Sequence, residues 1–365
     1  MIYLDYQATT PLCPEAREAM LKWLGGPDSD TFGNPHSPHR MGRMAAAAVE
    51  AAREHVAALL PLGGRVIFTS GATEALNLAL RGSRGDVLTF ATEHAAVLDC
   101  AGAVAAAGRS FTVLPVLPDG RADVAALAAA LTEQTGVVAA MAINNEIGVI
   151  HPLGQIAALA RKAGALMLVD GVQAFGRIAL TETGADMIAI SAHKIHGPKG
   201  IGALWVRDGV ELAPLLLGGG QERGLRSGTL SPALCAGFGA AARAARETMA
   251  DDLFHVEQLQ NKARDLFAGW QVNGSLDNRW PGNLNLRKPG LNVAQLMSDC
   301  RQVMFSAGSA CASGSGRPSH VLRALGLTSD EAKSAIRLGF GRYTTMGELE
   351  TAAAAIIAAA EEQMA

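Results

Sequence analysis

The middle of the chain alternates short apolar runs with longer segments that show helical spacing of apolar residues. The runs that predict strands are 66–69, 86–90, 111–116, 137–143, 166–170, 186–191 and 201–206. The segments that predict helices are 72–81, 91–107, 117–131 and 152–163, and a further helix over 232–246 closes the series. Strands that are apolar throughout are covered on both faces, and their alternation with helices is typical of a mainly parallel sheet. The pattern therefore predicts an α/β protein.

The remaining segments predict a second, smaller unit. A helix over 44–60 precedes the alternating series, and another over 251–267 follows it. Further on, the composition shifts to Asn, Gly, Pro and Trp between residues 269 and 290, after which short strands (283–286, 303–305, 336–340) mix with helices (293–299, 318–325, 346–364). We place the boundary near Ala250. The predicted domains are a large one over 12–250 and a small α+β one formed by 1–11 and 251–365.

Composition narrows the class of protein. The 365 residues are 49% hydrophobic and 18% charged with a net charge of −3, which indicates a folded protein without a nucleic-acid-binding stripe. No apolar run is long enough to cross a membrane, and the first residues do not resemble a signal peptide. The five cysteines form no C-x-x-C pair. We therefore expect a cytoplasmic protein with no disulfide framework and no metal site, in which a cysteine that matters is chemically active.

Candidate chemistry gathers at the predicted carboxyl ends of the strands, where open α/β sheets bind ligands. Residues 70–74 (Ser-Gly-Ala-Thr-Glu) follow strand 66–69 and open a helix, so their N–H groups could bind an anion or simply cap the helix. Asp170 ends strand 166–170, where it could pair with a protonated ring nitrogen or cap a turn. The sequence contains no nucleotide P-loop motif.

A lysine follows the next strand. Lys194 lies between the apolar strand 186–191 and a tight turn at 197–200, and there it could form a Schiff base when partly desolvated. The alternative is an ordinary solvated turn lysine. His193 and His196 lack a carboxylate or cysteine partner at metal-ligand spacing. We therefore interpret Lys194 as the chemically reactive residue of this turn.

Two loops rich in small residues complete the candidates. Residues 218–229 contain five glycines, two arginines and Ser-Gly-Thr, which suits either a second phosphate contact or a mobile surface loop. Residues 306–316 consist of Gly, Ser and Ala around Cys311, a setting that favours an accessible nucleophile over a packed structural thiol. The glycine fingerprint of a dinucleotide-binding enzyme is absent.

Three of these candidates follow one another at strand ends: the possible anion-binding turn at 70–74, Asp170 as a partner for a ring nitrogen, and Lys194 as a Schiff-base lysine. Together they predict a pyridoxal-5′-phosphate (PLP) enzyme. At these residues the sequence resembles the cysteine desulfurases of the class-V aminotransferase family. The resemblance extends over essentially the whole chain and is most specific at Asn-Asn-Glu-Ile-Gly (144–148) and Gly-Ser-Ala-Cys (308–311). It implies the type I fold of PLP-dependent transferases, with a seven-stranded, mainly parallel sheet and a smaller α+β domain.

The resemblance also implies residue roles. Lys194 would hold PLP, Asp170 would pair with its ring nitrogen, His94 would stack on the ring and move protons, and Cys311 would take the sulfur. The other residues implied to contact PLP are Ala72, Thr73, Asn145, Gln173, Ser191, His193 and, from the neighbouring subunit, Thr229. Arg337 and Asn34 would bind the substrate carboxylate, a task that suits the forked guanidinium group.

The expected reaction converts L-cysteine to L-alanine and a Cys311 persulfide, whose sulfur passes to an acceptor protein for iron–sulfur clusters or thio-cofactors. A homodimer is implied through Thr229. Three alternatives stay open at this point. The first is another class-V enzyme, such as an aminotransferase, kynureninase or selenocysteine lyase, and the second is a non-catalytic assembly partner with the same fold. A nicotinamide-dependent dehydrogenase is the most distant.

Overall fold

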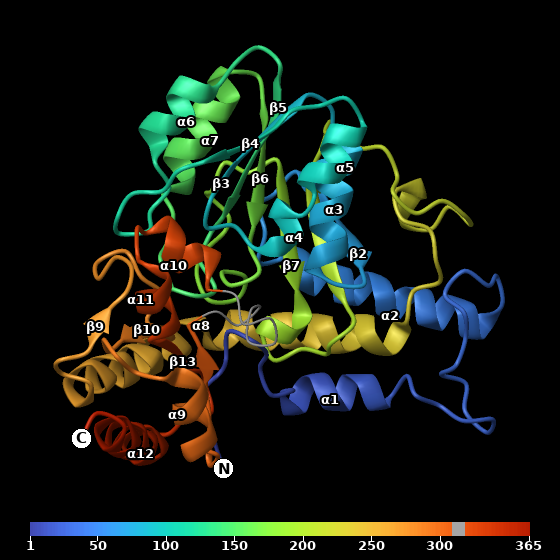
Figure 1. Ribbon diagram of the computed structural model, residues 1–365. Helices are drawn as coiled ribbons and strands as arrows, with labels where there is room; N and C mark the ends of the chain where they lie inside the picture. The colour runs from blue at the N-terminus through green and yellow to red at the C-terminus, as the bar shows by residue number, and fades with distance from the viewer. Residues whose placement is uncertain (309–317) are drawn as a thin grey trace.

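A seven-stranded sheet forms the centre of the computed structural model, which describes residues 1–308 and 318–365 (Figure 1). Its strand order is β2-β8-β7-β6-β5-β3-β4. The strands are β2 (Gly64–Thr69), β3 (Asp86–Phe90), β4 (Phe111–Leu114), β5 (Thr135–Met141), β6 (Leu166–Asp170), β7 (Met187–Ser191) and β8 (Gly202–Arg207). All neighbours are parallel except β8, which is antiparallel to both β2 and β7. The predicted fold class and sheet are confirmed.

Helices cover both faces of this sheet. Alternate residues of each strand point to opposite sides, so each strand packs against helices on both faces. In β2, Ile67 packs into a core with α3 (Ala72–Gly82), α4 (Ala95–Leu98) and α5 (Ala101–Ala106). Its neighbours Val66 and Phe68 pack on the other face, in a core that includes residues of the remaining large helices. Those helices are α2 (Arg40–Ala57), α6 (Val124–Ala130), α7 (Leu153–Lys162) and α8 (Pro232–Leu266), and α1 (Pro14–Leu21) lies against α8.

The longest helix corrects one prediction. The sequence predicted two helices, over 232–246 and 251–267, whereas α8 is a single helix of 35 residues. Ser231 caps its start and Pro232 occupies its first turn, but nothing interrupts it near Ala250, since residues 241–252 contain neither Gly nor Pro. The expected domain boundary therefore lies inside α8, and the division into two domains stays a prediction.

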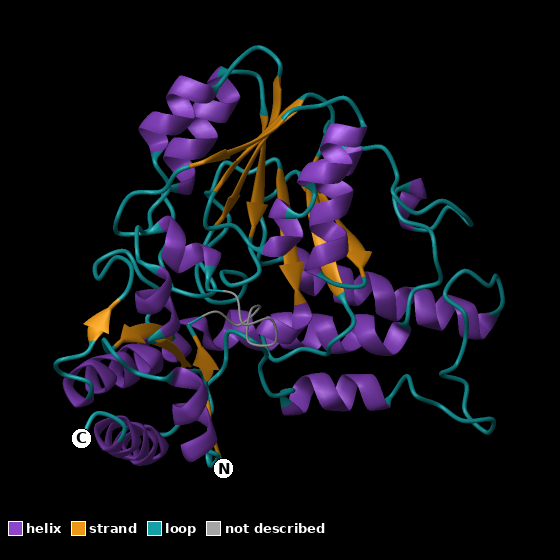
Figure 2. Cartoon of the chain, in the orientation of Figure 1, coloured by secondary structure: helices purple, strands orange, loops and turns teal. Residues whose placement is uncertain are grey.

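A second sheet of four strands lies beside the last part of α8, at the lower left of Figure 2. Its order is β12-β13-β10-β9, with β9 (Gln271–Val272), β10 (Asn283–Arg287), β12 (Ser306–Ala307) and β13 (Ala335–Gly339). The N-terminal strand β1 (Ile2–Tyr3) pairs with β11 (Val303–Met304), and Asp5 bridges to Gly339. The helices here are α9 (Val293–Asp299), α10 (His320–Ala324), α11 (Ser329–Lys333) and α12 (Met346–Glu362). The first residues of the chain thus join its last third, which brings their carbonyl groups to the site described next.

Across the residues that the structure describes, no helix combines the length and apolar character needed to cross a membrane. Nor do the described His, Cys, Asp and Glu residues form a group of three or more that could hold a metal ion.

Candidate active site

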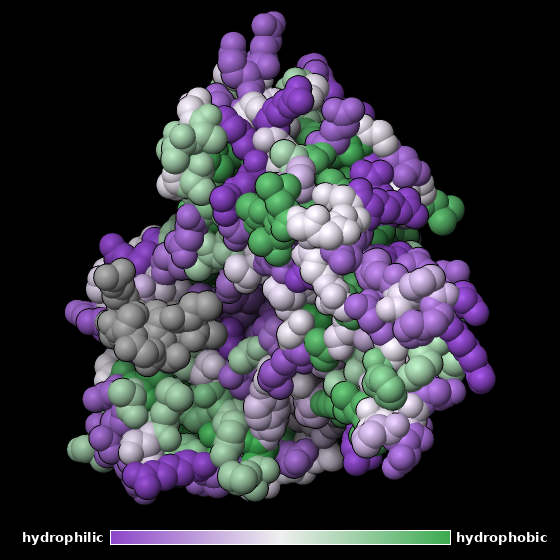
Figure 3. Space-filling view, turned by 90° about the vertical axis from the view of Figure 1, so that its right-hand side faces the viewer, coloured by the Kyte–Doolittle hydropathy of each residue, from purple (hydrophilic) through white to green (hydrophobic). Residues whose placement is uncertain are grey.

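A cavity of about 640 Å³ lies at the carboxyl ends of β5, β6 and β7, and the space-filling view shows one face of the molecule hollowed between its upper and lower parts (Figure 3). A volume of this size suits a small-molecule ligand. Ten residues proposed from the sequence line it: Ala72, Thr73, His94, Asn145, Asp170, Gln173, Ser191, His193, Lys194 and Arg337. Side chains from distant parts of the chain therefore meet in one place, as the strand-end argument predicts.

Lys194 ends the short 3₁₀ helix Ala192–Lys194 that follows β7. Its Nζ donates hydrogen bonds to the carbonyl oxygens of Gln7 and Ala8, each at 2.7 Å. Burial, together with the positive charges of Arg177 and Arg337, lowers the pKa of this amine to about 7. A substantial fraction of Lys194 is therefore neutral near pH 7, which is what an amine needs to attack a carbonyl group.

Asp170 ends β6 and is almost completely buried. Its Oδ1 accepts a hydrogen bond from the backbone N–H of Val172 at 3.0 Å. Burial raises the pKa of the carboxyl group, an effect that the Val172 N–H and the nearby His94 and Lys194 oppose. A protonated ring nitrogen in the cavity would supply the cation that stabilises the ionised form here.

His94 caps the first turn of α4. Its Nδ1 accepts a hydrogen bond from the N–H of Ala96 at 3.1 Å, so a neutral imidazole carries its proton on Nε2. Burial lowers the pKa of His94, and the charge of Lys194 adds to this effect. The side chain is therefore neutral and able to exchange a proton in the cavity.

The anion turn begins α3. The N–H of Ser70 donates to Glu74 at 2.7 Å, and Glu74 forms an ion pair with Arg226 at 2.7 Å. That pair connects the turn to the glycine-rich segment 218–229, which the sequence analysis treated as a separate candidate. The turn also lies tightly against β8, because a Cβ atom on Gly202 would come within 2.8 Å of the Gly71 Cα.

Two further residues approach the anion turn from β7. Ser191 is buried at the end of that strand, and the Nδ1 of His193 lies 3.1 Å from the hydroxyl of Thr9. Burial lowers the pKa of His193 to about 4, so its ring is neutral and can donate one hydrogen bond and accept another. These groups and the N–H groups of Ala72 and Thr73 suit a phosphate.

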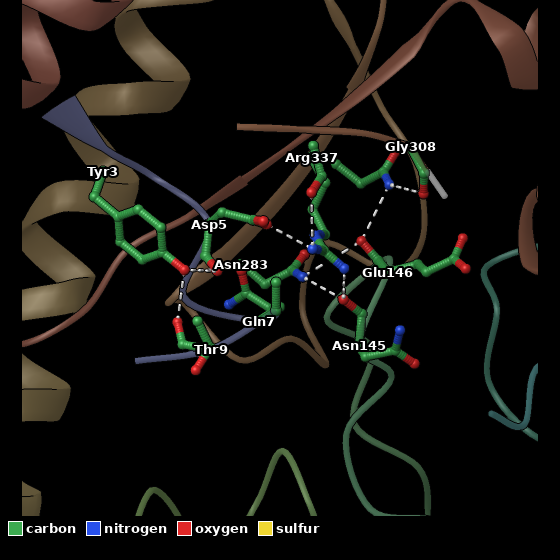
Figure 4. Close-up of polar contacts among 12 residues, drawn as sticks. Tyr3, Asp5, Gln7, Thr9, Asn145, Glu146, Asn283, Gly308 and Arg337 are labelled. Atoms are coloured by element: carbon green, nitrogen blue, oxygen red, sulfur yellow. Dashed lines mark hydrogen bonds and ion pairs between the residues drawn. The ribbon is translucent and has the colours of Figure 1, made fainter. Parts of the chain in front are cut away.

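Arg337 lies on β13 with its side chain fully buried (Figure 4). It donates to the Asn145 carbonyl at 3.0 Å and to the Ser306 hydroxyl at 3.2 Å, and it forms an ion pair with Asp5 at 2.6 Å. Its Nε has no hydrogen-bond partner among the described residues. Arg337 also lines the cavity, and its role in binding a carboxylate stays a prediction.

Three proposed residues are not brought to the cavity by the described part of this chain. Asn34 is exposed, and its Oδ1 accepts the N–H of His36 at 2.9 Å, which is the geometry of a turn. Thr229 is exposed and does not line the cavity. Cys311 lies outside the described residues. The roles of all three stay predictions.

Sequence reasoning missed several neighbours of the site. Gln7 and Ala8 act through carbonyl oxygens, which leave no signal in the sequence. Arg177 follows Gln173 by four residues and bonds to it, a spacing that was visible but unused. Glu93 is 1% exposed with Oε2 unpartnered among the described residues, and burial together with the charge of Asp170 raises its pKa well above the usual range.

The residues present fit PLP. The cavity is lined by N–H groups at the start of the 11-residue helix α3, by the buried Asp170, and by Lys194, whose pKa is near 7. These are the partners that a phosphate, a pyridine nitrogen and an aldehyde need, and all of them line the same cavity.

Comparison with known proteins agrees with this reading. The family model of class-V aminotransferases matches residues 2–351. The chain is 43% identical over 368 residues to a protein of Rickettsia bellii named cysteine desulfurase IscS, with 96% of this chain and 89% of that protein covered. A solved NifS-like protein matches with a TM-score of 0.89 at 31% identity, covering 97% of this chain and 98% of its own. A structure described as SspA in complex with cysteine matches with a TM-score of 0.79 at 31% identity, with coverages of 94% and 100%.

The chain therefore belongs to the class-V aminotransferase family, a class of PLP-dependent enzymes. Within that family its relatives group it with the cysteine desulfurases.

Proposed function

We propose that this enzyme is a PLP-dependent cysteine desulfurase that converts L-cysteine to L-alanine and transfers the sulfur to Cys311. The observation that carries the proposal is the convergence of Lys194, Asp170 and His94 on one cavity. The described residues on either side of Cys311 also bond to groups at that site. Ser306 contacts Arg337, and the His320 Nε2 lies 2.8 Å from the carbonyl of Glu93, next to His94.

Each residue has one task in this reaction. Bound PLP supplies an electron sink once its ring nitrogen is protonated, and Asp170 would keep that proton in place. Lys194 would hold the cofactor and, once released, move the proton at the substrate Cα, either alone or with His94. Arg337, which lines the cavity, would bind the substrate carboxylate through its guanidinium group. The phosphate would lie at the start of α3, with Ser191 and His193 beside it.

The sulfur transfer balances without an external oxidant. The Cys311 thiolate attacks the sulfur of the bound substrate, an S–S bond forms, and the C–S bond breaks with its electrons returning to the substrate carbon. Protonation of that carbon leads to alanine, and the enzyme keeps a persulfide. A thiol acceptor would then take the terminal sulfur from Cys311 and regenerate its thiolate.

The test compares Cys311→Ala with Cys300→Ala, because Cys300 is a buried cysteine in the core of the same C-terminal region. Cys311→Ala should keep the visible absorbance of bound PLP but produce almost no alanine from cysteine. Cys300→Ala should keep alanine production, since its thiol is buried and donates to the Ala355 carbonyl. Normal alanine production by Cys311→Ala would refute the role of this cysteine.

The substrate, the sulfur acceptor, the cellular location and the oligomeric state are also proposed. Relatives named cysteine desulfurase and a similar structure in complex with cysteine support L-cysteine as the substrate. We propose a protein as the sulfur acceptor, in iron–sulfur cluster or thio-cofactor synthesis. We also propose a reducing, cytoplasmic setting. Thr229 is exposed and could reach the cavity of a second copy, so we propose a homodimer, which sedimentation analysis would test.

A further inference from the structure

Arg177 does not line the main cavity but a second, smaller one that Lys194 also borders. This cavity of about 30 Å³ is lined by both residues, together with His196, Asp252 and Arg342. The Arg177 guanidinium donates to the backbone carbonyl of Lys194 at 3.0 Å. It is therefore attached directly to the segment that carries the reactive amine.

The same guanidinium also fixes a second residue of the site. It donates to the Gln173 Oε1 at 2.6 Å and to the Gln173 carbonyl at 3.2 Å. The Gln173 Nε2 then donates to the Gln7 carbonyl at 2.9 Å, and that oxygen also accepts from the Lys194 Nζ at 2.7 Å. A continuous chain of hydrogen bonds thus runs from Arg177 through Gln173 and Gln7 to Lys194.

The charge of Arg177 is not neutralised within the described part of the chain. All its hydrogen-bond acceptors there are carbonyl or amide oxygens, and the Trp280 ring lies 5.8 Å from the guanidinium carbon. Burial alone lowers its pKa, to about 10, which leaves it fully protonated at neutral pH. Arg342, on the same small cavity, differs because Asp252 pairs with it at 2.7 Å.

We propose that Arg177 is a positioning residue whose uncompensated charge keeps the Lys194 amine neutral and nucleophilic. A cation next to a desolvated lysine favours the uncharged amine, because protonation would place two like charges together. The inference rests on the proposed function, in which Lys194 holds PLP, and it adds how the chain prepares that lysine.

Other charges around Lys194 do not remove this effect. Arg337 acts in the same direction, but it is paired with Asp5, and Asp5 and Asp170 favour the protonated amine. His94 and His193 both have lowered pKa values and are neutral at pH 7. Facing the small cavity, His196 has a pKa of about 4 and Asp252 is paired with Arg342. Of the two arginines that lower the pKa of Lys194, Arg177 is thus the one without a carboxylate partner among the described residues.

The experiment measures the reactivity of Lys194 in the full chain after PLP has been removed. Trace acetylation with isotope-labelled acetic anhydride at pH 5 to 10, followed by mass spectrometry of the Lys194 peptide, gives the midpoint of its titration. The wild-type midpoint should lie near 7. Arg177→Gln and Arg177→Met should raise it by about one pH unit or more, the order of shift produced by one neighbouring charge. Arg177→Lys keeps the charge and should keep the acidic midpoint.

The matched control is Arg279→Gln. Arg279 is also an arginine whose pKa burial lowers to about 10 and whose hydrogen-bond acceptors are carbonyls, but it is not among the groups that act on Lys194. In Arg279→Gln the midpoint of the Lys194 titration should equal that of the wild type. Two results would overturn the inference. One is an unchanged Lys194 midpoint in a folded Arg177→Gln or Arg177→Met variant. The other is a rise in Arg177→Lys as large as in the neutral variants. Borohydride reduction of the PLP-loaded enzyme tests the proposed function separately, since cofactor attached elsewhere than Lys194 would overturn that role alone.

Discussion

The buried ion pair between Asp5 and Arg337 allows a quantitative prediction about stability. The side chain of Arg337 is 1% exposed and that of Asp5 18%, and their nitrogen–oxygen distance is 2.6 Å. Asp5→Ala leaves the guanidinium buried with only the hydrogen bonds to Asn145 and Ser306. Breaking a buried pair by removing one partner costs about 3–5 kcal/mol. Because two neutral acceptors remain, we expect a loss near the lower end, about 3 kcal/mol in the free energy of unfolding.

Two further variants separate charge from contact. Asp5→Asn keeps an oxygen acceptor but not the charge, so it should lose about 1.5–2 kcal/mol, within the range for a hydrogen bond to a charged group. The control is Glu350→Ala, which breaks the exposed pair that Glu350 forms with Lys262 at 2.8 Å. That pair has a similar distance but is open to solvent, so its removal should cause no measurable change.

The assay is urea unfolding followed by tryptophan fluorescence, with the midpoint and slope compared among the variants. Equal destabilisation by Asp5→Ala and Glu350→Ala would refute the reasoning, because burial would then not control the strength of these pairs. A loss for Asp5→Asn as large as for Asp5→Ala would instead assign the whole effect to the charge.

Three other changes test the site and its supports. Gly202→Ala should weaken PLP binding, measured by absorbance titration, because the new Cβ would press on Gly71 in the anion turn, whereas Gly154→Ala has free space and should bind normally. Glu93→Gln should flatten the dependence of stability on pH, since a buried acid with a raised pKa contributes stability below pH 4.5 that is lost as the pH rises. His151 has a pKa of about 4, so wild type should lose about 1.4 kcal/mol per pH unit relative to His151→Gln as the pH falls from 6.5 to 4.

Each of these has a contrary result. Unchanged PLP affinity in Gly202→Ala would show that the turn can move away from β8. A Glu93→Gln variant that loses stability most at pH 8 would mean that the native carboxyl group is ionised. Parallel curves for wild type and His151→Gln would mean that the folded histidine takes up a proton as readily as the unfolded one.

The sheet was predictable from the sequence because its strands are apolar on both faces and so differ from the helices between them. Segment 166–170, for example, matches β6 residue for residue. The helix break expected between residues 246 and 251 was wrong, because α8 continues through this segment, where Thr248 and Asp252 bond to Arg342. Arg342 lies far from this segment in the sequence, so a linear pattern does not report the contact.

The main residues of the site were predictable because each carries a reactive or charged side chain at a strand end. The network that supports them was not. The acceptors for Lys194 are backbone carbonyls from the first ten residues, nearly two hundred positions away in the sequence. Arg337 could be read as a surface charge on a strand until β13 was seen to be fully buried. Such contacts depend on which distant segments meet, and composition or spacing does not report that.

The unbroken course of α8 has a mechanical consequence. At 1.5 Å per residue the helix is about 50 Å long, and one apolar core connects it to both sheets, with Phe238 near its start and Ala263 near its end. A continuous helix offers no loop residue to absorb a change of backbone angles. The helix therefore holds the two sheets at a fixed distance from each other. Substrate entry and product exit must therefore rely on movements of loops and side chains around the cavity, not on opening of the molecule about a hinge at residue 250.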